Sequence, residues 1–262
     1  MKVMIVQQVA IIASPALMMG LMLTTSVGNT FRIHWPSWKF LGAACLLPVA
    51  LHPLSVELLG RLQWFFGELP EGIVQALRQM SDPDQPLWFV LLTFAVVPAF
   101  CEEIAFRGFM LSGFGRRGRI ALAVGLSSVV FGVMHMIPQQ VFNAGLMGLV
   151  LGMLCVRSNS LVPCIVFHFI TNSLGVVHGR FATDWYNAAP VPMFFAVEDG
   201  GLRYRWPTLV ICLAIAAPLL VWLFRSPKAR RHEAVPSGGN GNGLLETISA
   251  ATAKDALVAH RK

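Results

Sequence analysis

Residues 86–112 read PLWFVLLTFAVVPAFCEEIAFRGFMLS, and Glu102, Glu103 and Arg107 are the only charged residues in this run. The run is longer than the roughly 20 apolar residues that cross the hydrocarbon core of a bilayer as a helix. Charged side chains are costly inside a bilayer, and they usually face a cavity or a partner. The stretch therefore predicts a membrane-spanning helix with a polar site near its middle.

The rest of the chain has the same character. Of its 262 residues, 55% are hydrophobic and 13% are charged, whereas soluble domains carry about 25% charged residues. The mean hydropathy is +0.64. A porin-like barrel would instead show alternating segments of about ten residues. We therefore predict an all-α, polytopic membrane helical bundle with about seven transmembrane helices.

The apolar segments expected to span the membrane are separated by short charged stretches. They are 3–25, 40–59, 86–112, 120–137, 141–156, 161–177 and 206–224. The first is longer than the apolar part of a typical signal peptide and no A-x-A site follows it, so we expect a retained helix. A mixed stretch at 60–85, with Trp64 and Phe65 ahead of Glu68, is expected to lie at the membrane interface.

The net charge of +7 is interpreted as membrane topology. The basic residues do not follow an aromatic stripe, so no nucleic-acid partner is expected. Cytoplasmic loops collect Lys and Arg, and one side of the predicted bundle receives most of these residues. That side carries Arg32, Lys39, Arg116, Arg117, Arg119, Arg157, Arg225, Lys228, Arg230 and Arg231. We expect this side, with the C-terminus, to be cytoplasmic in a bacterial plasma membrane.

Small residues within the predicted spans have a structural interpretation. Gly148 and Gly152 form a GxxxG pair that favours close helix packing. No two cysteines form a CxxC pair, so we expect small buried residues in helices and neither a disulfide framework nor a zinc-thiolate site. The cysteines are Cys45, Cys101, Cys155, Cys164 and Cys212.

The charged residues of the third span divide into a pair and a single carboxylate. Glu103 and Arg107 are four residues apart, so they share a helix face and can form an ion pair. Glu102 points about 100° away from Glu103. An ion pair that only locks two helices would explain Glu103 and Arg107, but it leaves Glu102 unpaired, which is expensive in a bilayer. Glu102 is therefore the candidate general base.

Two later spans add histidines. His135 lies near the end of the fourth span, where a lone histidine is more often an interfacial or core residue. His168 and Asn172 share a face of the sixth span, as a helix-packing pair would also do. One shared cavity would bury the polar groups that the third, fourth and sixth spans contribute. A carboxylate with two histidines can hold zinc or activate water directly, and the sequence contains no HExxH, G-x-S-x-G or P-loop motif.

The three motifs EExxxR, FxxxH and HxxxN, in this order on successive helices, resemble the CPBP family. These are the CAAX-processing and bacteriocin-processing intramembrane endopeptidases, also called the Abi family. The resemblance covers about residues 87–177. It implies a helical bundle whose cavity opens into the lipid bilayer, and a peptidase with a protein or peptide substrate.

The resemblance also implies roles for the polar residues. Glu102 and His135 would activate the attacking water, while His168 and Asn172 would stabilise the oxyanion. Glu103 and Arg107 would organise the site. The cofactor stays open: a divalent metal such as zinc, held by Glu102, His135 and His168, and hydrolysis without a metal are both compatible with the sequence.

The domain organisation follows from these segments. Residues 1–85 hold the N-terminal transmembrane helices and the interfacial segment, and 86–178 form the catalytic core. A polar loop and the last helix occupy 179–224, and a basic, disordered tail occupies 225–262. Residues 51–86 also resemble the region that precedes the same motifs in bacterial fusions with an ABC-type sodium-extrusion permease, which adds ABC transporter components to the candidate partners.

Two rival functions and one conflict stay open. The polar set could form a proton or cation relay in a transporter or transporter accessory subunit, although no inverted repeat is apparent. In a non-catalytic scaffold, the same polar groups would only pack the helices together.

The conflict concerns His135, which lies near the non-cytoplasmic end of its span while Glu102 and His168 lie deeper. Either the fourth helix extends past Pro138 or the cavity opens toward that side, which argues against a literal CAAX substrate.

Overall fold

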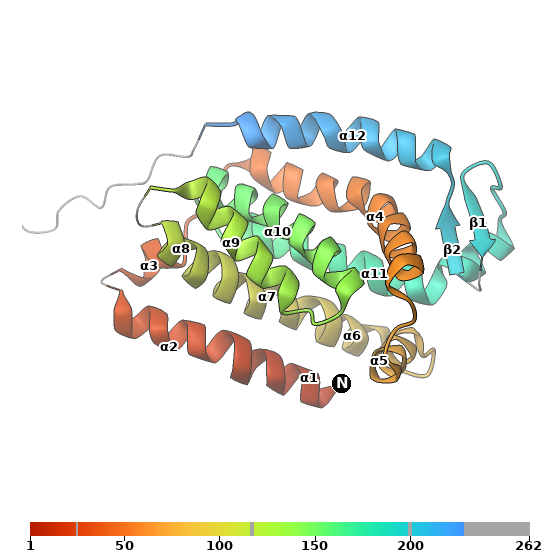
Figure 1. Ribbon diagram of the computed structural model, residues 1–262, viewed down its shortest axis with the longest axis horizontal. Coiled ribbons are helices and arrows are strands. Elements are labelled where there is room, and N and C mark those ends of the chain that lie inside the picture. The colour runs from red at the N-terminus through yellow and green to blue at the C-terminus, as the bar shows by residue number, and fades with distance from the viewer. Residues whose placement is uncertain (25, 116–117, 199–200, 228–262) are drawn as a thin grey trace, which may run out of the picture. The chain divides into compact units, whose positions relative to one another are not determined.

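The computed structural model describes residues 1–24, 26–115, 118–198 and 201–227, which are mostly helical (Figure 1). In the labels used here, η marks a π-helical segment. The elements are α1 (Lys2–Gln7), η1 (Gln8–Ala13), α2 (Ser14–Leu23), α3 (Val27–Thr30), α4 (Trp38–Phe66), α5 (Glu71–Ser81), α6 (Leu87–Leu91), η2 (Leu92–Val96), α7 (Val97–Glu103), η3 (Ile104–Met110), α8 (Leu111–Phe114), α9 (Ile120–Val133), α10 (Pro138–Ser158), α11 (Val162–Ala188), β1 (Phe195–Glu198), β2 (Gly201–Tyr204) and α12 (Trp206–Arg225).

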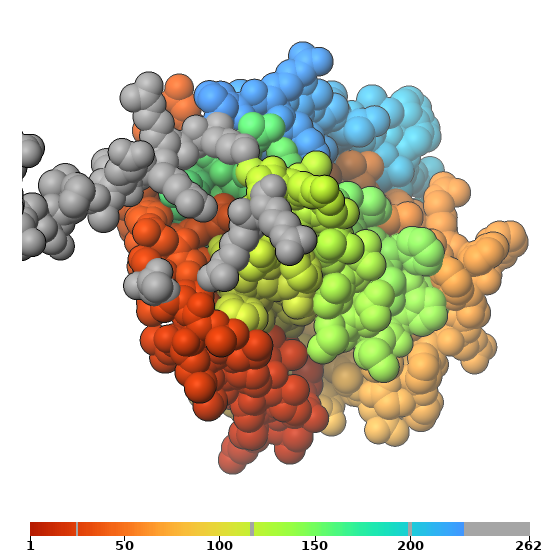
Figure 2. Space-filling view, turned by 60° about the vertical axis from the view of Figure 1, so that its left-hand side comes forward, coloured from red at the N-terminus to blue at the C-terminus, as the bar shows by residue number. Residues whose placement is uncertain are grey.

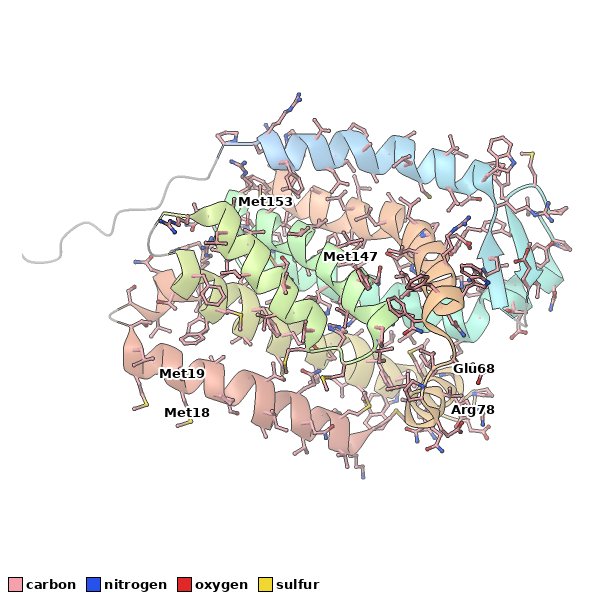
Figure 3. All side chains as sticks on the ribbon, viewed as in Figure 1. Met18, Met19, Glu68, Arg78, Met147 and Met153 are labelled. Carbon is pink, nitrogen blue, oxygen red and sulfur yellow. The ribbon has the colours of Figure 1, made fainter. Side chains whose placement is uncertain are left out.

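Several of these elements join end to end into long apolar helices. Within the described residues, 6 helices are long and apolar enough to cross a membrane: Lys2–Leu23, Trp38–Phe66, Leu87–Phe114, Pro138–Ser158, Val162–Ala188 and Trp206–Arg225. A shorter apolar helix, Ile120–Val133, lies between the third and fourth of them. Outward-pointing side chains such as Met18 and Met19 are apolar (Figure 3). The predicted all-α bundle is confirmed, and the chain is an integral membrane protein.

The main apolar core lies where α4, α9, α10, α11 and α12 meet. Leu47, Leu151, Leu154 and Phe167 are fully buried in it. The burial expected for the cysteines holds for Cys101, Cys155 and Cys164 but is wrong for Cys45, which is exposed on α4.

The stretch 60–85, expected at the interface, contains the end of α4 and the amphipathic helix α5. Trp64 and Phe65 are exposed at the end of α4, and Glu68 and Arg78 lie at the same end of the bundle (Figure 3). Residues 228–262 of the expected basic tail lie outside the described residues, while Arg225 ends α12.

The fourth predicted span, which corresponds to α9, is shorter than expected. The sequence pattern suggested 120–137, but α9 ends at Val133. Pro138 begins α10, and the residue before a proline is disfavoured in the helical region, so Ile137 is extended with φ −115 and ψ 120. The fourth helix therefore does not continue past Pro138, and His135 lies in the turn between α9 and α10.

The sixth predicted span, which corresponds to α11, is longer than expected. The sequence predicts a polar loop after residue 178, but residues 179–188 continue α11, and a hairpin of β1 and β2 follows. His178 links the two parts, because its Nε2 lies 3.1 Å from the Leu202 carbonyl oxygen and its Nδ1 lies 3.1 Å from the Tyr204 hydroxyl. Burial raises the pKa of Tyr204 to about 12, so its hydroxyl stays protonated as a hydrogen-bond donor.

Glycines allow α9 and α10 to pack closely. A Cβ atom on Gly152 would lie 2.8 Å from Val124 Cγ1, and one on Gly148 would lie 3.0 Å from the Cα of Ser128. The packing role predicted for Gly148 and Gly152 is confirmed. The tightest approach is at Gly132 of α9, where a Cβ would lie 2.5 Å from the Val141 carbonyl oxygen.

This packing predicts opposite effects for the same substitution at two positions of α9. Gly132→Ala should destabilise the bundle by about 1–3 kcal/mol, because an extra methyl group forces a backbone shift in a tight contact. Gly125→Ala is the control, because its Cβ would meet nothing within 4 Å and alanine favours helix by up to about 1 kcal/mol. Thermal unfolding in detergent checks both, and equal melting temperatures for the two variants would contradict the packing.

Candidate active site

The helix that carries the two glutamates contains two wide π-helical turns, η2 and η3, on either side of α7. Such turns occur often at functional sites. The turn at η3 is held by side chains from neighbouring helices: Ser127 Oγ donates to the Phe106 carbonyl at 3.1 Å, and Cys155 Sγ donates to the Arg107 carbonyl at 3.8 Å. These bonds fix the backbone from which Arg107 projects into the bundle.

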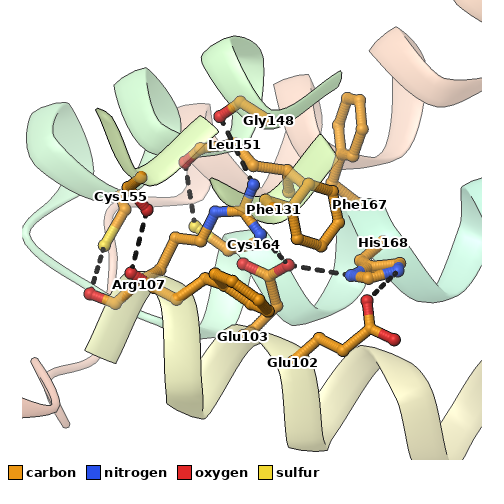
Figure 4. Close-up of polar contacts among 12 residues, drawn as sticks. Glu102, Glu103, Arg107, Phe131, Gly148, Leu151, Cys155, Cys164, Phe167 and His168 are labelled. Carbon is orange, nitrogen blue, oxygen red and sulfur yellow. Dashed lines mark hydrogen bonds and ion pairs between the residues drawn. The ribbon is translucent and has the colours of Figure 1, made fainter. Parts of the chain in front are cut away.

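The Glu103 carboxylate is the centre of the polar cluster (Figure 4). Its Oε1 accepts from Arg107 NH1 at 2.7 Å and from His168 Nδ1 at 2.8 Å. Glu103 and Arg107 are both 0% exposed, and the side chain of His168 is 7% exposed. A second Arg107 nitrogen, NH2, lies 3.4 Å from the Gly148 carbonyl oxygen. The ion pair predicted from the spacing of Glu103 and Arg107 is present, and it also holds His168.

Phe131 of α9 gathers the cationic and aromatic groups around this carboxylate. The guanidinium carbon of Arg107 lies 4.1 Å from the ring centroid of Phe131, within cation–π distance. The same ring meets His168 edge-on at 5.8 Å and His135 at 5.0 Å between centroids. In the sequence, Phe131 is marked only as the first residue of FxxxH, yet its ring is the contact that joins His135 to the rest of the cluster.

Glu102 points away from the ion pair, as its helical position predicts. Its Oε2 lies 3.8 Å from His168 Nε2, and its side chain is 13% exposed. Its Oε1 accepts a hydrogen bond of 2.8 Å from Gln8 Nε2, which comes from the N-terminal helix. Gln8 was not among the predicted residues. Its only signal in the sequence is a polar side chain inside the first apolar segment, shared with Gln7.

His168 therefore contacts both carboxylates through opposite ring nitrogens. Glu103 is ionised by its pairing with Arg107, and an ionised carboxylate only accepts hydrogen bonds. His168 Nδ1 must then carry a proton, which leaves Nε2 as the atom that faces Glu102. At 3.8 Å the two groups are too far apart for a direct hydrogen bond, and a gap of this kind is commonly bridged by water.

His135 lies beside the cluster without joining its ion pairs. Its Nδ1 lies 2.9 Å from the Phe131 carbonyl oxygen, which makes Nδ1 the donor and leaves Nε2 available. Among the described residues, Glu102 has a histidine nitrogen within 4.0 Å at His168, but not at His135. His135 is thus placed by its ring contact with Phe131 and by the turn after α9.

Asn172 is held by a hydrogen bond to a backbone carbonyl of the third span. Pro98 has no backbone N–H, so it cannot donate to the carbonyl of Phe94, four residues earlier. Asn172 Nδ2 donates to that carbonyl at 3.1 Å. The amide group of Asn172 therefore has a structural bond to η2, and it retains a second N–H.

The donor groups do not form a three-ligand metal site. Within the described residues, no group of three His, Cys, Asp or Glu side chains is placed to hold a metal ion. Catalytic zinc takes three protein ligands and one water, whereas Glu102 and His168 converge without a third donor. The trio of Glu102, His135 and His168 suggested by the sequence is thus not gathered as a preformed zinc site.

Removing one partner of the buried ion pair should be strongly destabilising. Arg107→Met leaves the Glu103 charge without its cation, which typically costs about 3–5 kcal/mol. Arg107→Met with Glu103→Gln removes both charges, so part of the lost stability should return. Thermal unfolding of the two purified variants checks this. A double variant no more stable than Arg107→Met would show that the Glu103 charge is not compensated by Arg107.

Residues 84–174 match the family model described as Type II CAAX prenyl endopeptidase Rce1-like. All three motifs lie within this segment, so the resemblance to CAAX-processing endopeptidases is confirmed. The match does not reach residues 51–83, and the resemblance to permease fusions gains no support from it. No curated protein and no solved structure matches the chain.

Proposed function

Because residues 84–174 match the family model of Rce1-like type II CAAX prenyl endopeptidases, we propose that this chain hydrolyses a peptide bond of a membrane-associated protein or peptide. The observation that carries the proposal is the division between the two glutamates. Glu103 is neutralised by Arg107, whereas Glu102 faces a histidine nitrogen across 3.8 Å with part of its side chain still exposed. A carboxylate in that position is suited to taking a proton from water.

The proposed reaction uses water as the nucleophile. Glu102 takes a proton from the water, with His135 helping to polarise it, and the resulting hydroxide attacks the carbonyl carbon of the scissile bond. The oxyanion is held by an N–H of Asn172 and by an N–H at Nε2 of His168, the ring nitrogen that does not bond Glu103, because donors aimed at the developing charge stabilise the transition state. The C–N bond then breaks, and the proton held by Glu102 passes to the leaving amine nitrogen.

The route by which substrate arrives follows from the short fourth helix. A helix of 14 residues is about 21 Å long at 1.5 Å per residue, less than the roughly 30 Å of the hydrocarbon core. With the start of α9 at the membrane surface, a helix of this length would bring the turn that carries His135 to within membrane depth, where non-helical backbone is tolerated if it lines a water-filled cavity. We place the opening of the site on this side, with the C-terminus on the opposite, cytoplasmic side of a bacterial plasma membrane.

The assay that tests the proposal uses the full chain in proteoliposomes with a panel of internally quenched peptides. The panel contains an S-prenylated peptide ending in a CAAX box, a leader-type peptide and a transmembrane peptide. Wild type should cleave at least one of them. Glu102→Ala should abolish cleavage, and His168→Ala should lower kcat by about 10²–10³-fold, the usual loss of an oxyanion donor. Both variants should insert and fold as wild type does.

Full activity in Glu102→Ala would remove Glu102 as the base and sink the assignment. The transporter alternative is measured in the same vesicles, where ion flux lost on Glu102→Gln without any peptide cleavage would favour a relay. Parallel reactions with and without EDTA test whether a divalent metal takes part.

A second substitution can distinguish a structural role of Asn172 from a catalytic one. Asn172→Ala removes both the bond to the Phe94 carbonyl and the proposed oxyanion donor. Pro98→Ala restores a backbone N–H that can donate to Phe94, but it restores no donor to the oxyanion. If Asn172 acts in catalysis, Asn172→Ala with Pro98→Ala should regain stability while kcat stays about 10²-fold low. Recovery of kcat in the double variant would reduce Asn172 to a structural role.

A further inference from the structure

The N-terminal helix supplies a polar contact to the site from outside the family segment. Gln8 Nε2 donates to Glu102 Oε1 at 2.8 Å, and the two residues are 94 positions apart in the sequence. Figure 2 shows the red N-terminal segment at the surface of the molecule, and this segment packs against α7 and η3. The same helix packs through small buried residues, Ala13 and Ala16.

Gln8 is not explained by packing alone. Its Oε1 is buried and has no hydrogen-bond partner among the described protein atoms. An unpaired buried carbonyl costs about 1–3 kcal/mol, which an apolar side chain at this position would avoid. Gln7, the neighbouring residue, is exposed on the outer side of the helix. The amide at position 8 thus leaves one buried oxygen unpaired while its nitrogen donates to Glu102.

We propose that Gln8 is a positioning residue for the hydrolytic reaction, acting through Glu102. This inference rests on the proposed function. Gln8 holds Glu102 Oε1 on the side away from His168, so that Oε2 faces His168 Nε2 across the 3.8 Å gap. Without that donor, the carboxylate is free to rotate toward His168 and close the gap in a direct ion pair.

Closing the gap would remove the position of the attacking water. The reacting oxygen must contact Glu102 while it approaches the substrate carbonyl, and a misplacement of about 1 Å can cost on the order of 10²-fold in rate. Substrate binding does not depend on this orientation, so the loss should fall on kcat and leave KM nearly unchanged. This separates positioning of the base from a contact between Gln8 and substrate.

The test uses the same substitution at adjacent positions, measured with the peptide of the panel that wild type cleaves fastest. Gln8→Met keeps the length of the side chain and removes its donor, while Gln7→Met is the matched control on the exposed face. Gln8→Asn keeps an amide but shortens it by one carbon, so its nitrogen falls short of Glu102. Wild type and Glu102→Ala are assayed beside them, and thermal unfolding is recorded for every variant.

We expect Gln8→Met and Gln8→Asn to lower kcat about 10–100-fold with KM within about twofold, and Gln7→Met to match wild type. A Gln8→Met kcat within twofold of wild type would overturn the inference. So would a rise in KM at constant kcat, or loss of folded protein in both Gln8 variants. Failure of the proposed function is distinguishable, because Glu102→Ala would then cleave as fast as wild type, and the inference would fall with it.

Discussion

The buried carboxylate of Glu103 is the interaction on which the site depends. One oxygen of this group accepts from Arg107 and from His168, so side chains of two helices are fixed by a single charge inside the bundle. The charge is tolerated because Arg107 neutralises it, and Arg107 is itself covered by the ring of Phe131 and by the backbone at Gly148. The close packing of α9 on α10 therefore serves the electrostatics of the site as well as the stability of the fold.

Adjacent positions in the chain give the two glutamates different work. Glu103 faces inward, where it is bound to Arg107 and His168. Glu102, about 100° around the helix, faces the remaining nitrogen of His168. His168 is the link between them, since the bond at Nδ1 sets the direction of Nε2. A histidine oriented by one carboxylate toward another gives a geometry in which water can be activated without any of these side chains moving far.

Much of this could be predicted from sequence because it depends on local spacing. The i, i+4 rule placed Glu103 with Arg107 and put Glu102 on another face, and hydropathy located the spans. The missing parts depend on tertiary contacts. No pattern in the sequence shows that Phe131 would stack on Arg107, or that Asn172 would bind the carbonyl left free by Pro98. Gln8 was missed because a single polar residue in an apolar segment has no partner until the bundle folds. Hydropathy alone places the end of α9 too late, because the apolar pattern continues to Ile137 whereas Pro138 disfavours helical backbone at the residue before it.

Peptide-bond hydrolysis that depends on Glu102 is the central claim, and the most direct measurement is made in the native host. Membrane proteins from cells with the wild-type chain and cells with Glu102→Gln are compared for new N-termini and C-termini by mass spectrometry. The account predicts at least one membrane-associated protein that is cut in wild-type cells and accumulates uncut in Glu102→Gln cells, with both chains present at equal levels. Identical sets of termini in the two strains would contradict it.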